Sequence, residues 1–275
     1  MNAKRFFITG VTSGFGRAIA TAALEAGHDV VGTVRSEPAA REFESLGERA
    51  HARLLDVTAI DSIATIAAEV ESRIGPIDVL VNNAGYGHEG ILEESSIEAM
   101  RHQFEVNVFG AAALIKAFVP YFRERRAGRI INITSMGGFV TMPGIAWYCG
   151  SKFALEGISE VLGKEVAGFD VFVTAVAPGS FRTDWAGRSM IRAPRGIADY
   201  DAVMDPIRAA RVAKSGKQLG DPAKAAQVIL KLADHPAPPA HLLLGSDALA
   251  LVRAKLESLQ LQIDEWEDVT RSTDG

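Results

Sequence analysis

The sequence predicts an α/β fold: a single doubly wound domain in which a parallel sheet of about seven strands has helices on both faces. Short apolar runs alternate with longer helical patterns along the 275 residues. Several of these runs are apolar at nearly every position, as strands are when helices cover both faces of a parallel sheet. The chain length and the hydrophobic fraction of 48% are enough for one sizeable core.

Seven segments have the length and composition of buried strands: residues 5–9, 29–34, 52–56, 77–82, 129–134, 170–176 and 241–245. Helical patterns fill the intervals, and such alternation predicts right-handed crossovers between parallel strands. Because no internal repeat, low-complexity tract or inter-domain linker interrupts the pattern, we expect residues 1–275 to form one domain.

Short start and stop signals mark several of the helices. Gly27 is expected at the C-terminal end of the first helix. Ser95 and Glu98, in the sequence SSIE, have the spacing of a capping box before a long helix. Asp221 and Pro222 are expected as the N-cap and the first residue of a late helix.

One long irregular segment, residues 179–220, interrupts the alternation. It contains Pro194, Gly196, Pro206 and Gly216, with some helical pattern between them. Long irregular segments in compact domains are often lids or binding loops. We therefore expect a substrate-binding loop or lid here, whereas the polar residues 267–275 are expected to fray.

The composition argues against several functional classes. Lys and Arg total 29 against 34 Asp and Glu, and no basic cluster is long enough for a nucleic-acid surface. No stretch approaches the roughly 18 apolar residues of a membrane span, and the N-terminus lacks the apolar length of a signal peptide.

The single cysteine, Cys149, fits a reducing compartment and is expected to be a buried packing residue. We expect a cytoplasmic protein with no nucleic-acid or membrane partner. The six histidines lack metal-ligand clustering, so no metal site is predicted.

A glycine-rich turn, TGVTSGFG, follows the first predicted strand and opens a helix. Glycines allow backbone conformations and close approaches that a Cβ would obstruct, and a helix N-terminus suits a pyrophosphate. The spacing G-x-x-x-G-x-G is a variant of the dinucleotide fingerprint, and alone it is also typical of a simple turn. Its place at the first strand–helix junction favours a dinucleotide site. The candidate cofactor residues here are Gly10, Thr12, Ser13, Gly14, Phe15 and Gly16.

The end of the second predicted strand indicates which dinucleotide fits. An NAD site usually has a carboxylate at this point, whereas an NADP site has an arginine nearby. Here Val34 occupies the acidic position and Arg35 follows it. A guanidinium pairs with a 2′-phosphate in fork geometry, so we expect NADP(H) to be preferred over NAD(H). The alternative is that Arg35 is an ordinary solvated arginine.

Tyr148 and Lys152 are four residues apart, so on a helix both side chains lie on one face. An ammonium near a phenol lowers the tyrosine pKa, and Tyr148 could then pass a proton to or from an alcohol oxygen. That spacing alone is common in surface pairs. Ser135 follows the strand at 129–134, at the sheet edge where ligands bind, and could hydrogen-bond a substrate carbonyl. Without the other motifs, Ser135 is equally typical of a turn or helix cap.

The segments TGVTSGFG, NNAG and PGSFRT, at residues 9–16, 82–85 and 178–183, occur in the order found in the short-chain dehydrogenase/reductase family. They resemble that family's TGxxxGxG motif, the motif after its fourth strand and the loop beside its nicotinamide. The resemblance covers nearly the whole chain. It is strongest to the subgroup of hydroxysteroid and retinol dehydrogenases and related bacterial reductases, and it implies a Rossmann-type domain.

The resemblance implies roles for four side chains. Ser135 precedes Tyr148 by thirteen residues, as in the family, and Tyr148-x-x-x-Lys152 matches the catalytic pair. By this resemblance Tyr148 is the acid/base, and Lys152 holds the nicotinamide ribose and lowers the tyrosine pKa. Ser135 orients the carbonyl, and Asn107 keeps a water in a proton relay to Lys152.

The resemblance also implies the remaining cofactor contacts. Asp56 resembles the residue that bonds the adenine amino group, with Val57 beside the ring. Tyr148 and Lys152 contact the nicotinamide half as well. The other implied contacts are Asn83, Ala84, Gly85, Val176, Pro178, Gly179, Phe181 and Thr183.

Substrate contacts are expected around the nicotinamide mouth, from Gly137, Phe139, Met142, Trp147 and Trp185. The glycine leaves room, and the aromatic and methionine side chains supply apolar walls, which suits a medium-sized hydrophobic carbonyl or secondary alcohol. His88 is expected to face solvent, with contact to substrate as the alternative.

The sequence therefore predicts an NADP(H)-dependent oxidoreductase that interconverts a carbonyl and a secondary alcohol. One alternative is a non-catalytic NADP(H) sensor or scaffold, and another is the same chemistry with NAD(H). A related epimerase or dehydratase is disfavoured because the TGxxGxxG spacing of those relatives is missing. Family members commonly pair through the helices here at about 96–125 and 145–167, so a homodimer or homotetramer is expected.

Overall fold

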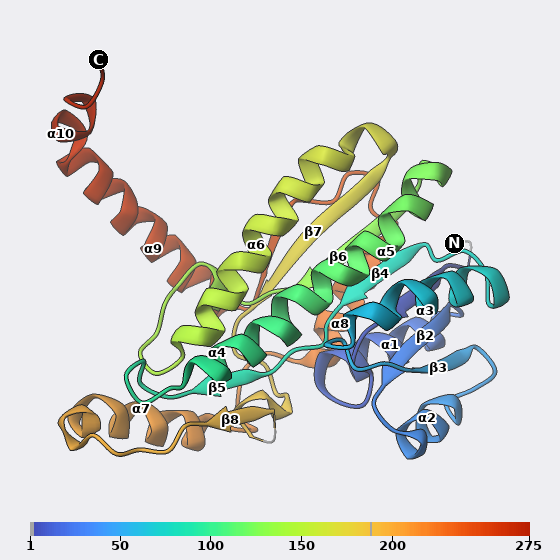
Figure 1. Cartoon of the computed structure of the whole chain (residues 1–275), viewed down its shortest axis with the longest axis horizontal. Helices are drawn as coiled ribbons and strands as arrows, with labels where there is room; N and C mark the ends of the chain where they lie inside the picture. Colours follow the sequence, from blue (N-terminus) through green and yellow to red (C-terminus); the bar gives the residue numbers. More distant parts are fainter. Residues whose placement is uncertain (1–2, 188) are drawn as a thin grey trace.

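Seven parallel strands form the central sheet, in the order β3-β2-β1-β4-β6-β7-β9. The computed structural model describes residues 3–187 and 189–275 (Figure 1). The strands are β1 Arg5–Ile8, β2 Asp29–Val34, β3 Ala50–Leu54, β4 Val79–Asn82, β6 Gly128–Ile133, β7 Val171–Pro178 and β9 His241–Leu244. The seven predicted strands are confirmed, although the third begins two residues earlier and the fourth two residues later than predicted. The strand order reverses between β1 and β4, which is where open α/β sheets bind their ligands.

Helices cover both faces of the sheet, which confirms the doubly wound fold. One face carries α1 Gly14–Glu25, α2 Glu37–Glu44 and α8 Pro222–Asp234. The other carries α3 Ile60–Arg73, α5 Gly110–Arg125 and α6 Ala146–Val166. The remaining helices are α4 Ile97–Phe104, a π-helix at Glu105–Phe109, α7 Asp201–Lys214, α9 Ser246–Glu265 and α10 Glu267–Arg271.

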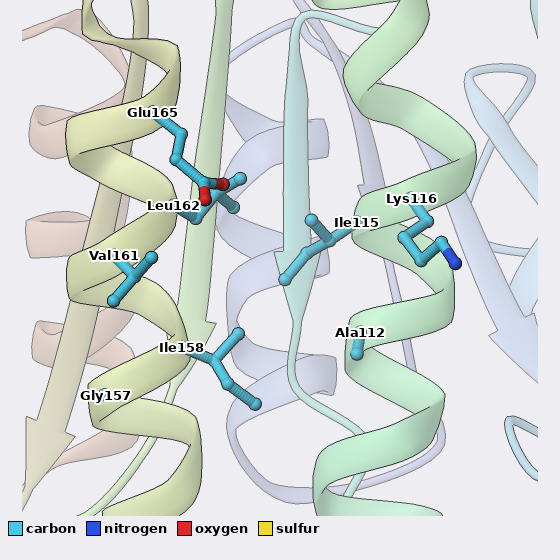
Figure 2. Close-up of a pocket in the computed structure, with 8 residues that line it drawn as sticks. All are labelled: Ala112, Ile115, Lys116, Gly157, Ile158, Val161, Leu162 and Glu165. Atoms are coloured by element: carbon cyan, nitrogen blue, oxygen red, sulfur yellow. The ribbon is translucent and has the colours of Figure 1, made fainter.

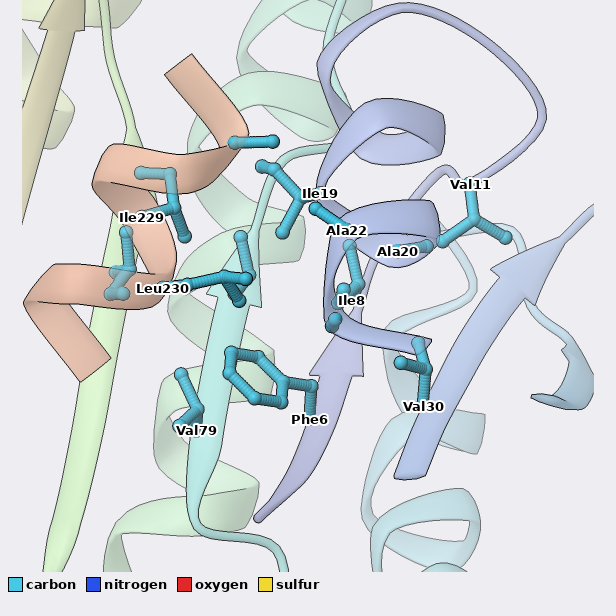
Figure 3. Close-up of a cluster of buried hydrophobic side chains, with 14 of the residues drawn as sticks. Phe6, Ile8, Val11, Ile19, Ala20, Ala22, Val30, Val79, Ile229 and Leu230 are labelled. Carbon is cyan, nitrogen blue, oxygen red and sulfur yellow. The ribbon is translucent and has the colours of Figure 1, made fainter. Parts of the chain in front are cut away.

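The β1 side chains show why the strands are apolar at every position. Phe6 and Ile8 enter the core under α1 and α8, where they lie near Ile229 (Figure 3). Phe7 enters the opposite core and packs against Phe118 of α5, with the ring centroids 4.9 Å apart. Because successive side chains point to opposite faces, a sheet covered on both sides needs no polar alternation. Burial of each such side chain stabilises the fold by about 1.5–3 kcal/mol.

Two of the three helix signals are confirmed. Gly27 follows α1 with a φ of +83°, in the left-handed region that favours glycine. Asp221 caps α8 by accepting a hydrogen bond from Ala223 N, with Pro222 at the first helical position. The predicted cap of α4 is wrong by one residue. Ser96 is the N-cap and accepts from Ala99 N, whereas the Ser95 hydroxyl donates to the Ile91 carbonyl.

The segment at 179–220 is more regular than predicted. It contains the short strand β8 Met190–Arg192 and the helix α7, and β8 pairs in parallel with β5 Gly87–Glu89. This two-stranded sheet was not predicted, because a strand of three residues has no detectable periodicity. Residue 188 of the segment lies outside the described residues.

A buried carboxylate attaches this segment to the rest of the domain. The Glu89 side chain on β5 is only 1% exposed, and three arginines contact it. Arg208 and Arg211 of α7 donate to its two oxygens over 2.9 and 2.8 Å, and Arg192 of β8 lies 3.3 Å away. Burial alone would raise the pKa of Glu89, but the hydrogen bond from Arg211 and the three positive charges outweigh it, and the pKa is lowered.

One helical stretch of the described chain, Ile97–Arg125, is long and apolar enough to cross a membrane by length and composition, with a mean hydropathy of 1.2. The core helix of a globular domain has the same properties. In this structure, Leu114, Phe118 and Phe122 pack in the core on the sheet.

Helix α9 leaves the domain instead of packing along it (Figure 1). Ala248 and Val252 in its first two turns are buried against the domain. Every residue from Leu256 to the C-terminus is exposed. The last residues are not all frayed as predicted, because Glu267–Arg271 forms the short helix α10.

Candidate active site

The glycine-rich turn after β1 forms a cradle for a phosphate group. Gly10 and Gly14 have φ values of +70° and +57°, in the left-handed region. A Cβ added at Gly16 would collide with the Gly10 carbonyl oxygen and lie 2.5 Å from Asn83 Nδ2. Because the first N–H groups of a helix have no partners within it, the N-terminus of α1 offers donors to an anion. These features fit the pyrophosphate of a dinucleotide.

The loop after β4 is attached to the same cradle. The Thr9 hydroxyl accepts hydrogen bonds from Asn83 N and Ala84 N, over 2.9 and 2.8 Å. Asn83 Nδ2 donates in return to the Thr9 carbonyl over 2.8 Å. The residues predicted as cofactor contacts after β1 and after β4 therefore lie side by side at the switch point of the sheet.

Arg35 and Asp56 lie together at the far end of the cradle. Arg35 is exposed after the buried Val34, and Asp56 is exposed after β3. Asp56 Oδ1 accepts hydrogen bonds from Thr58 N and Thr58 Oγ1, over 3.0 and 2.8 Å. These bonds, the backbone one first, lower the pKa of Asp56, and the nearby charge of Arg35 adds to the effect. A cation and an anion are thus both available where the adenosine half of a dinucleotide would lie.

Tyr148 on α6 is buried under Trp185, with the two ring centroids 5.0 Å apart. A Cβ added at Gly137 would lie 3.3 Å from both Ser135 Oγ and Tyr148 Cε1, so these two side chains flank one small space. Burial raises the pKa of Tyr148 to about 12, and interactions with Ser135 and Trp185 only partly oppose the rise. The prediction that Lys152 lowers the Tyr148 pKa is therefore wrong. With the protein's own groups alone, this pKa is raised.

The position of Lys152 explains why it does not lower the Tyr148 pKa. Lys152 Nζ donates to the Ile133 carbonyl over 2.8 Å and lies 5.8 Å from the centroid of the Tyr148 ring. Burial lowers the pKa of Lys152 to about 8, and the charge of Glu156 partly opposes this. At neutral pH the tyrosine is therefore a neutral phenol, and the lysine is mostly a cation.

Sequence reasoning missed a third ionisable group, Glu156, one turn beyond Lys152 on α6. Its carboxylate is buried, and it accepts a hydrogen bond from the hydroxyl of Thr134, the residue after β6. His241 Nδ1 of β9 lies 2.7 Å from its other oxygen, and the His241 side chain is 34% exposed. Burial raises the pKa of Glu156, while Thr134, His241 and Lys152 oppose the rise. The spacing of four residues from Lys152 was the one signal that could have indicated it.

Asn107 lies within the π-helix between α4 and α5 and is 1% exposed. Its Nδ2 donates to the Tyr86 carbonyl and to the Ser151 hydroxyl, over 3.2 and 3.0 Å, and its Oδ1 accepts from Tyr86 N. A Cβ added at Gly85 would lie 3.0 Å from Asn107 Oδ1 and 3.7 Å from Lys152 Nζ. The structure therefore brings Asn107 and Lys152 to the same small space, and π-helical turns are frequent at functional sites.

The loop after β7 covers the glycine cradle. The Phe181 ring packs against Phe15 at the start of α1, with centroids 5.0 Å apart. A Cβ added at Gly14 would lie 3.7 Å from Thr183 Cβ. Two of the predicted contacts in this loop, Phe181 and Thr183, thus lie over the turn that would hold the phosphates.

Asp247, in the first turn of α9, holds that loop in place and was not predicted. Its Oδ2 accepts a hydrogen bond from Ser180 N over 2.8 Å. A side chain at Gly179 would collide with the same carboxylate. The glycine after Pro178 is therefore required by the close approach of Asp247.

The predicted substrate residues do not all surround Tyr148. Met142 and Trp185 pack with Tyr148, and Gly137 adjoins it. Phe139 instead packs edge-on against His241, with centroids 5.8 Å apart, on the Glu156 side of the helix. The Trp147 indole N–H is buried and has no hydrogen-bond partner among residues 3–187 and 189–275.

Two further expectations have clear outcomes. Cys149 is 3% exposed, and burial raises its pKa, so it is the packing residue that was predicted. His88 was expected to face solvent, but it is 3% exposed on β5, and burial lowers its pKa. Its strand pairing with β8 explains the burial. No group of His, Cys, Asp or Glu in the described part of the chain could hold a metal ion.

A phosphate cradle at the switch point of a doubly wound sheet, with a buried tyrosine, lysine, serine and asparagine beside it, is typical of nicotinamide-dependent oxidoreductases. A family model described as short chain dehydrogenase matches residues 4–191. The chain belongs to the short-chain dehydrogenase/reductase family.

Three similar proteins support this assignment. Oxidoreductase BOA17 of Botryotinia fuckeliana is 34% identical over 97% of this chain and 98% of its own length. The crystal structure of a short-chain dehydrogenase from Streptomyces avermitilis is 42% identical, covers all of both chains and superposes with a TM-score of 0.92. A short chain dehydrogenase/reductase from Burkholderia phymatum, solved in complex with NAD, is 26% identical over 95% of both chains, with a TM-score of 0.81.

Proposed function

We propose that the protein is an NADP(H)-dependent oxidoreductase that interconverts a carbonyl and a secondary alcohol on a medium-sized hydrophobic substrate. The observation that carries this proposal is the geometry beside the glycine cradle: a Cβ added at Gly137 would lie 3.3 Å from both Ser135 Oγ and Tyr148 Cε1, so the two side chains flank one small space. The Tyr148 phenol is protonated near neutral pH, so it has a proton to donate to a carbonyl oxygen in that space. The nicotinamide, when bound in the cradle, supplies the hydride.

The protein's own side chains would then donate the proton and stabilise the charge that this leaves behind. Tyr148 donates its proton to the substrate oxygen, and Ser135, which flanks the same small space, hydrogen-bonds that oxygen. The mostly protonated Lys152 stabilises the negative charge left on Tyr148. Asn107, beside Lys152, is placed to hold a water that returns the proton.

An apolar wall beside Tyr148 supports a hydrophobic substrate. Met142 and Trp185 pack on the tyrosine, and Trp185 covers its ring. Trp185 belongs to the 179–220 segment, so we propose that this segment acts as a lid over the reacting carbonyl. A relationship to the hydroxysteroid and retinol dehydrogenase subgroup remains a proposal.

The Glu156→Gln substitution is expected to move the alkaline limb of the pH profile to lower pH. The Glu156 charge raises the pKa of Lys152, and burial lowers it to about 8. Loss of that charge leaves burial unopposed, so Lys152 loses its proton at a lower pH. Because catalysis uses the protonated lysine, kcat/KM should fall at lower pH than in the wild type.

The matched control for this profile is Glu160→Gln, an exposed carboxylate one turn further along α6. It should leave the alkaline limb unchanged. Identical profiles in Glu156→Gln and the wild type would contradict the role of Lys152 as the titrating group.

Arg35→Ala is expected to reduce the preference for NADPH over NADH by about 10- to 100-fold, which corresponds to the roughly 1.5–3 kcal/mol of a hydrogen bond to a charged group. Arg35 is exposed at the end of the cradle and free to reach a 2′-phosphate. The measurement is the ratio of kcat/KM for the two cofactors.

Arg41→Ala, an exposed arginine on α2, is the control for a general change of surface charge. A ratio that stays the same in Arg35→Ala would contradict the role of Arg35. A wild-type ratio that favours NADH would support NAD(H), with which the relative from Burkholderia phymatum was solved.

A non-catalytic NADP(H) sensor is the second candidate. The test is a panel of carbonyl substrates in which oxidation of NADPH is followed by absorbance, with cofactor binding measured in parallel. Turnover supports the enzyme, whereas binding without turnover across the panel would support the sensor.

We also propose a homo-oligomer that pairs through α5 and α6. A groove of about 370 Å³ lies between these helices (Figure 2). Ile115, Ile158 and Leu162 line it, and Val161 is 55% exposed beside it. A monomeric mass by light scattering would contradict this pairing. A cytoplasmic location is likewise proposed.

A further inference from the structure

The indole N–H of Trp185 is a buried hydrogen-bond donor beside the reacting tyrosine. Its Nε1 atom is buried and makes no hydrogen bond within the residues that the structure describes. Buried donors in folded proteins are almost always bonded, because an unpaired donor loses its bonds to water and gains nothing in return. An exception that lies beside a reacting group therefore points to a donor that is used during the reaction.

Two attachments fix the position of the Trp185 ring. A Cβ added at Gly87 of β5 would lie 3.0 Å from Cε2 and Cζ2 of Trp185 and 3.1 Å from its Nε1, so the ring rests directly on this glycine. Gly87 N also donates to the Ser189 carbonyl over 3.0 Å, which anchors the chain just after Trp185. Before it, the Thr183 hydroxyl caps the short turn Asp184–Ala186 that carries the indole. The ring is thus held by β5 on one side and by the loop over the glycine cradle on the other.

The N–H of Trp185 faces the oxygen of Tyr148. The two ring planes are tilted by 56°, with centroids 5.0 Å apart. Ser135 and Trp185 are the two groups whose interactions lower the pKa of Tyr148, against the larger effect of burial. A donor lowers the pKa of a phenol because it stabilises the charged oxygen. The indole is therefore directed at the phenol oxygen, although it makes no hydrogen bond of normal geometry to the neutral phenol.

The proposed reaction leaves a negative charge on Tyr148 that needs donors. Lys152 Nζ donates to the Ile133 carbonyl and lies 5.8 Å from the centroid of the Tyr148 ring, so it acts on the tyrosine through its charge. The Ser135 hydroxyl has to bond the substrate oxygen in the same step. The indole N–H can only donate, and it is not shared with another acceptor of the described chain.

We propose that the Trp185 indole N–H donates a hydrogen bond to the Tyr148 oxygen once that oxygen has lost its proton. This inference rests on the proposed function: Tyr148 gives its proton to the substrate oxygen, the carbonyl carbon receives the hydride, and the negative charge stays on the Tyr148 oxygen. Trp185 keeps its own proton throughout. The 179–220 segment then contributes a group to the reaction in addition to covering the site.

The first test measures the ionisation of Tyr148 and needs no turnover. Site-specific replacement of Trp185 by benzothienylalanine keeps the shape of the indole but puts sulfur in place of the N–H, so Tyr148 stays buried. The protein is labelled with carbon-13 at the tyrosine Cζ, and the Tyr148 signal, assigned by its loss in Tyr148→Phe, is followed by NMR as the pH is raised. The variant should have a smaller phenolate fraction than the wild type at each alkaline pH, because a group that lowers the Tyr148 pKa is gone.

The titratable neighbours of Tyr148, Cys149 and Lys152, are the same in both proteins, so they cannot cause the difference. The matched control is the same replacement at Trp266, which is 59% exposed at the end of α9, and it should leave the Tyr148 titration unchanged. Identical titrations of the Trp185 variant and the wild type would overturn the proposal.

The second test measures the rate of carbonyl reduction in a single turnover with NADPH. Benzothienylalanine at position 185 should lower this rate by about 10- to 100-fold, the effect of one hydrogen bond to a charged group, and leave the cofactor Kd unchanged. An unchanged rate would contradict the inference, and so would a loss of cofactor binding that accounts for the lower rate. Absence of turnover in the wild type would instead contradict the proposed function, and the NMR titration would still decide whether Trp185 donates to Tyr148.

Discussion

Tyr148→Phe is expected to lower kcat by about 10²- to 10⁴-fold and to leave cofactor affinity unchanged, because it removes only the hydroxyl that donates the proton. The ring still packs beneath Trp185, so the walls of the site should keep their shape. Steady-state kinetics with a substrate from the panel give kcat, and a binding titration gives the cofactor Kd.

The control for this variant is Tyr121→Phe, which removes a phenol hydroxyl on α5. That helix leads into the start of β6, so Tyr121 lies toward the sheet edge opposite the site. Near-normal kcat in Tyr148→Phe would refute the acid role. Loss of cofactor binding together with kcat would instead indicate a structural effect.

Glu89→Ala is expected to destabilise the protein by about 3–5 kcal/mol, because it leaves Arg208 and Arg211 partly buried without the charge that they share. The midpoint of thermal unfolding should fall by roughly 10 °C. Unfolding in urea measures the free energy, and proteolysis within residues 179–220 shows whether that segment opens first.

The pH dependence provides a second readout for Glu89. Its pKa is lowered in the folded protein, so its contribution is fully present above the ordinary carboxyl pKa and is lost as pH falls through the folded value. Glu93→Ala is the matched control, since Glu93 is an exposed carboxylate nearby that accepts a hydrogen bond from Tyr200. Equal stability of Glu89→Ala and the wild type would show that the arginines are satisfied without Glu89.

The sheet could be predicted because its determinants are local. Phe6, Phe7 and Ile8 are apolar in succession, and only a strand buried on both faces accommodates that pattern. The cradle was predictable for the same reason, since Gly10, Gly14 and Gly16 are close in sequence and each has a backbone reason to be glycine.

The missed features depend on contacts between distant segments. Glu156 and His241 are 85 residues apart, and nothing in either local pattern indicates that they meet. In the sequence Glu89 has the pattern of an ordinary loop carboxylate. Its role is visible only in the structure, where α7 brings Arg208 and Arg211 to it. The pKa of Tyr148 was predicted in the wrong direction because burial beneath Trp185, and not its neighbour on the helix, determines it.

The π-helix that carries Asn107 places one extra residue between α4 and α5. A π-turn contains one residue more than the α-helical turn it replaces, so deletion of one residue from Glu105–Phe109 would restore an α-helical turn and leave α4 and α5 in nearly the same relative orientation. The core contacts of Leu114 and Phe118 and the cap at Ser96 would then be kept. The deletion would instead remove the local backbone geometry that brings Asn107 beside Lys152, so it should damage the site more than the fold.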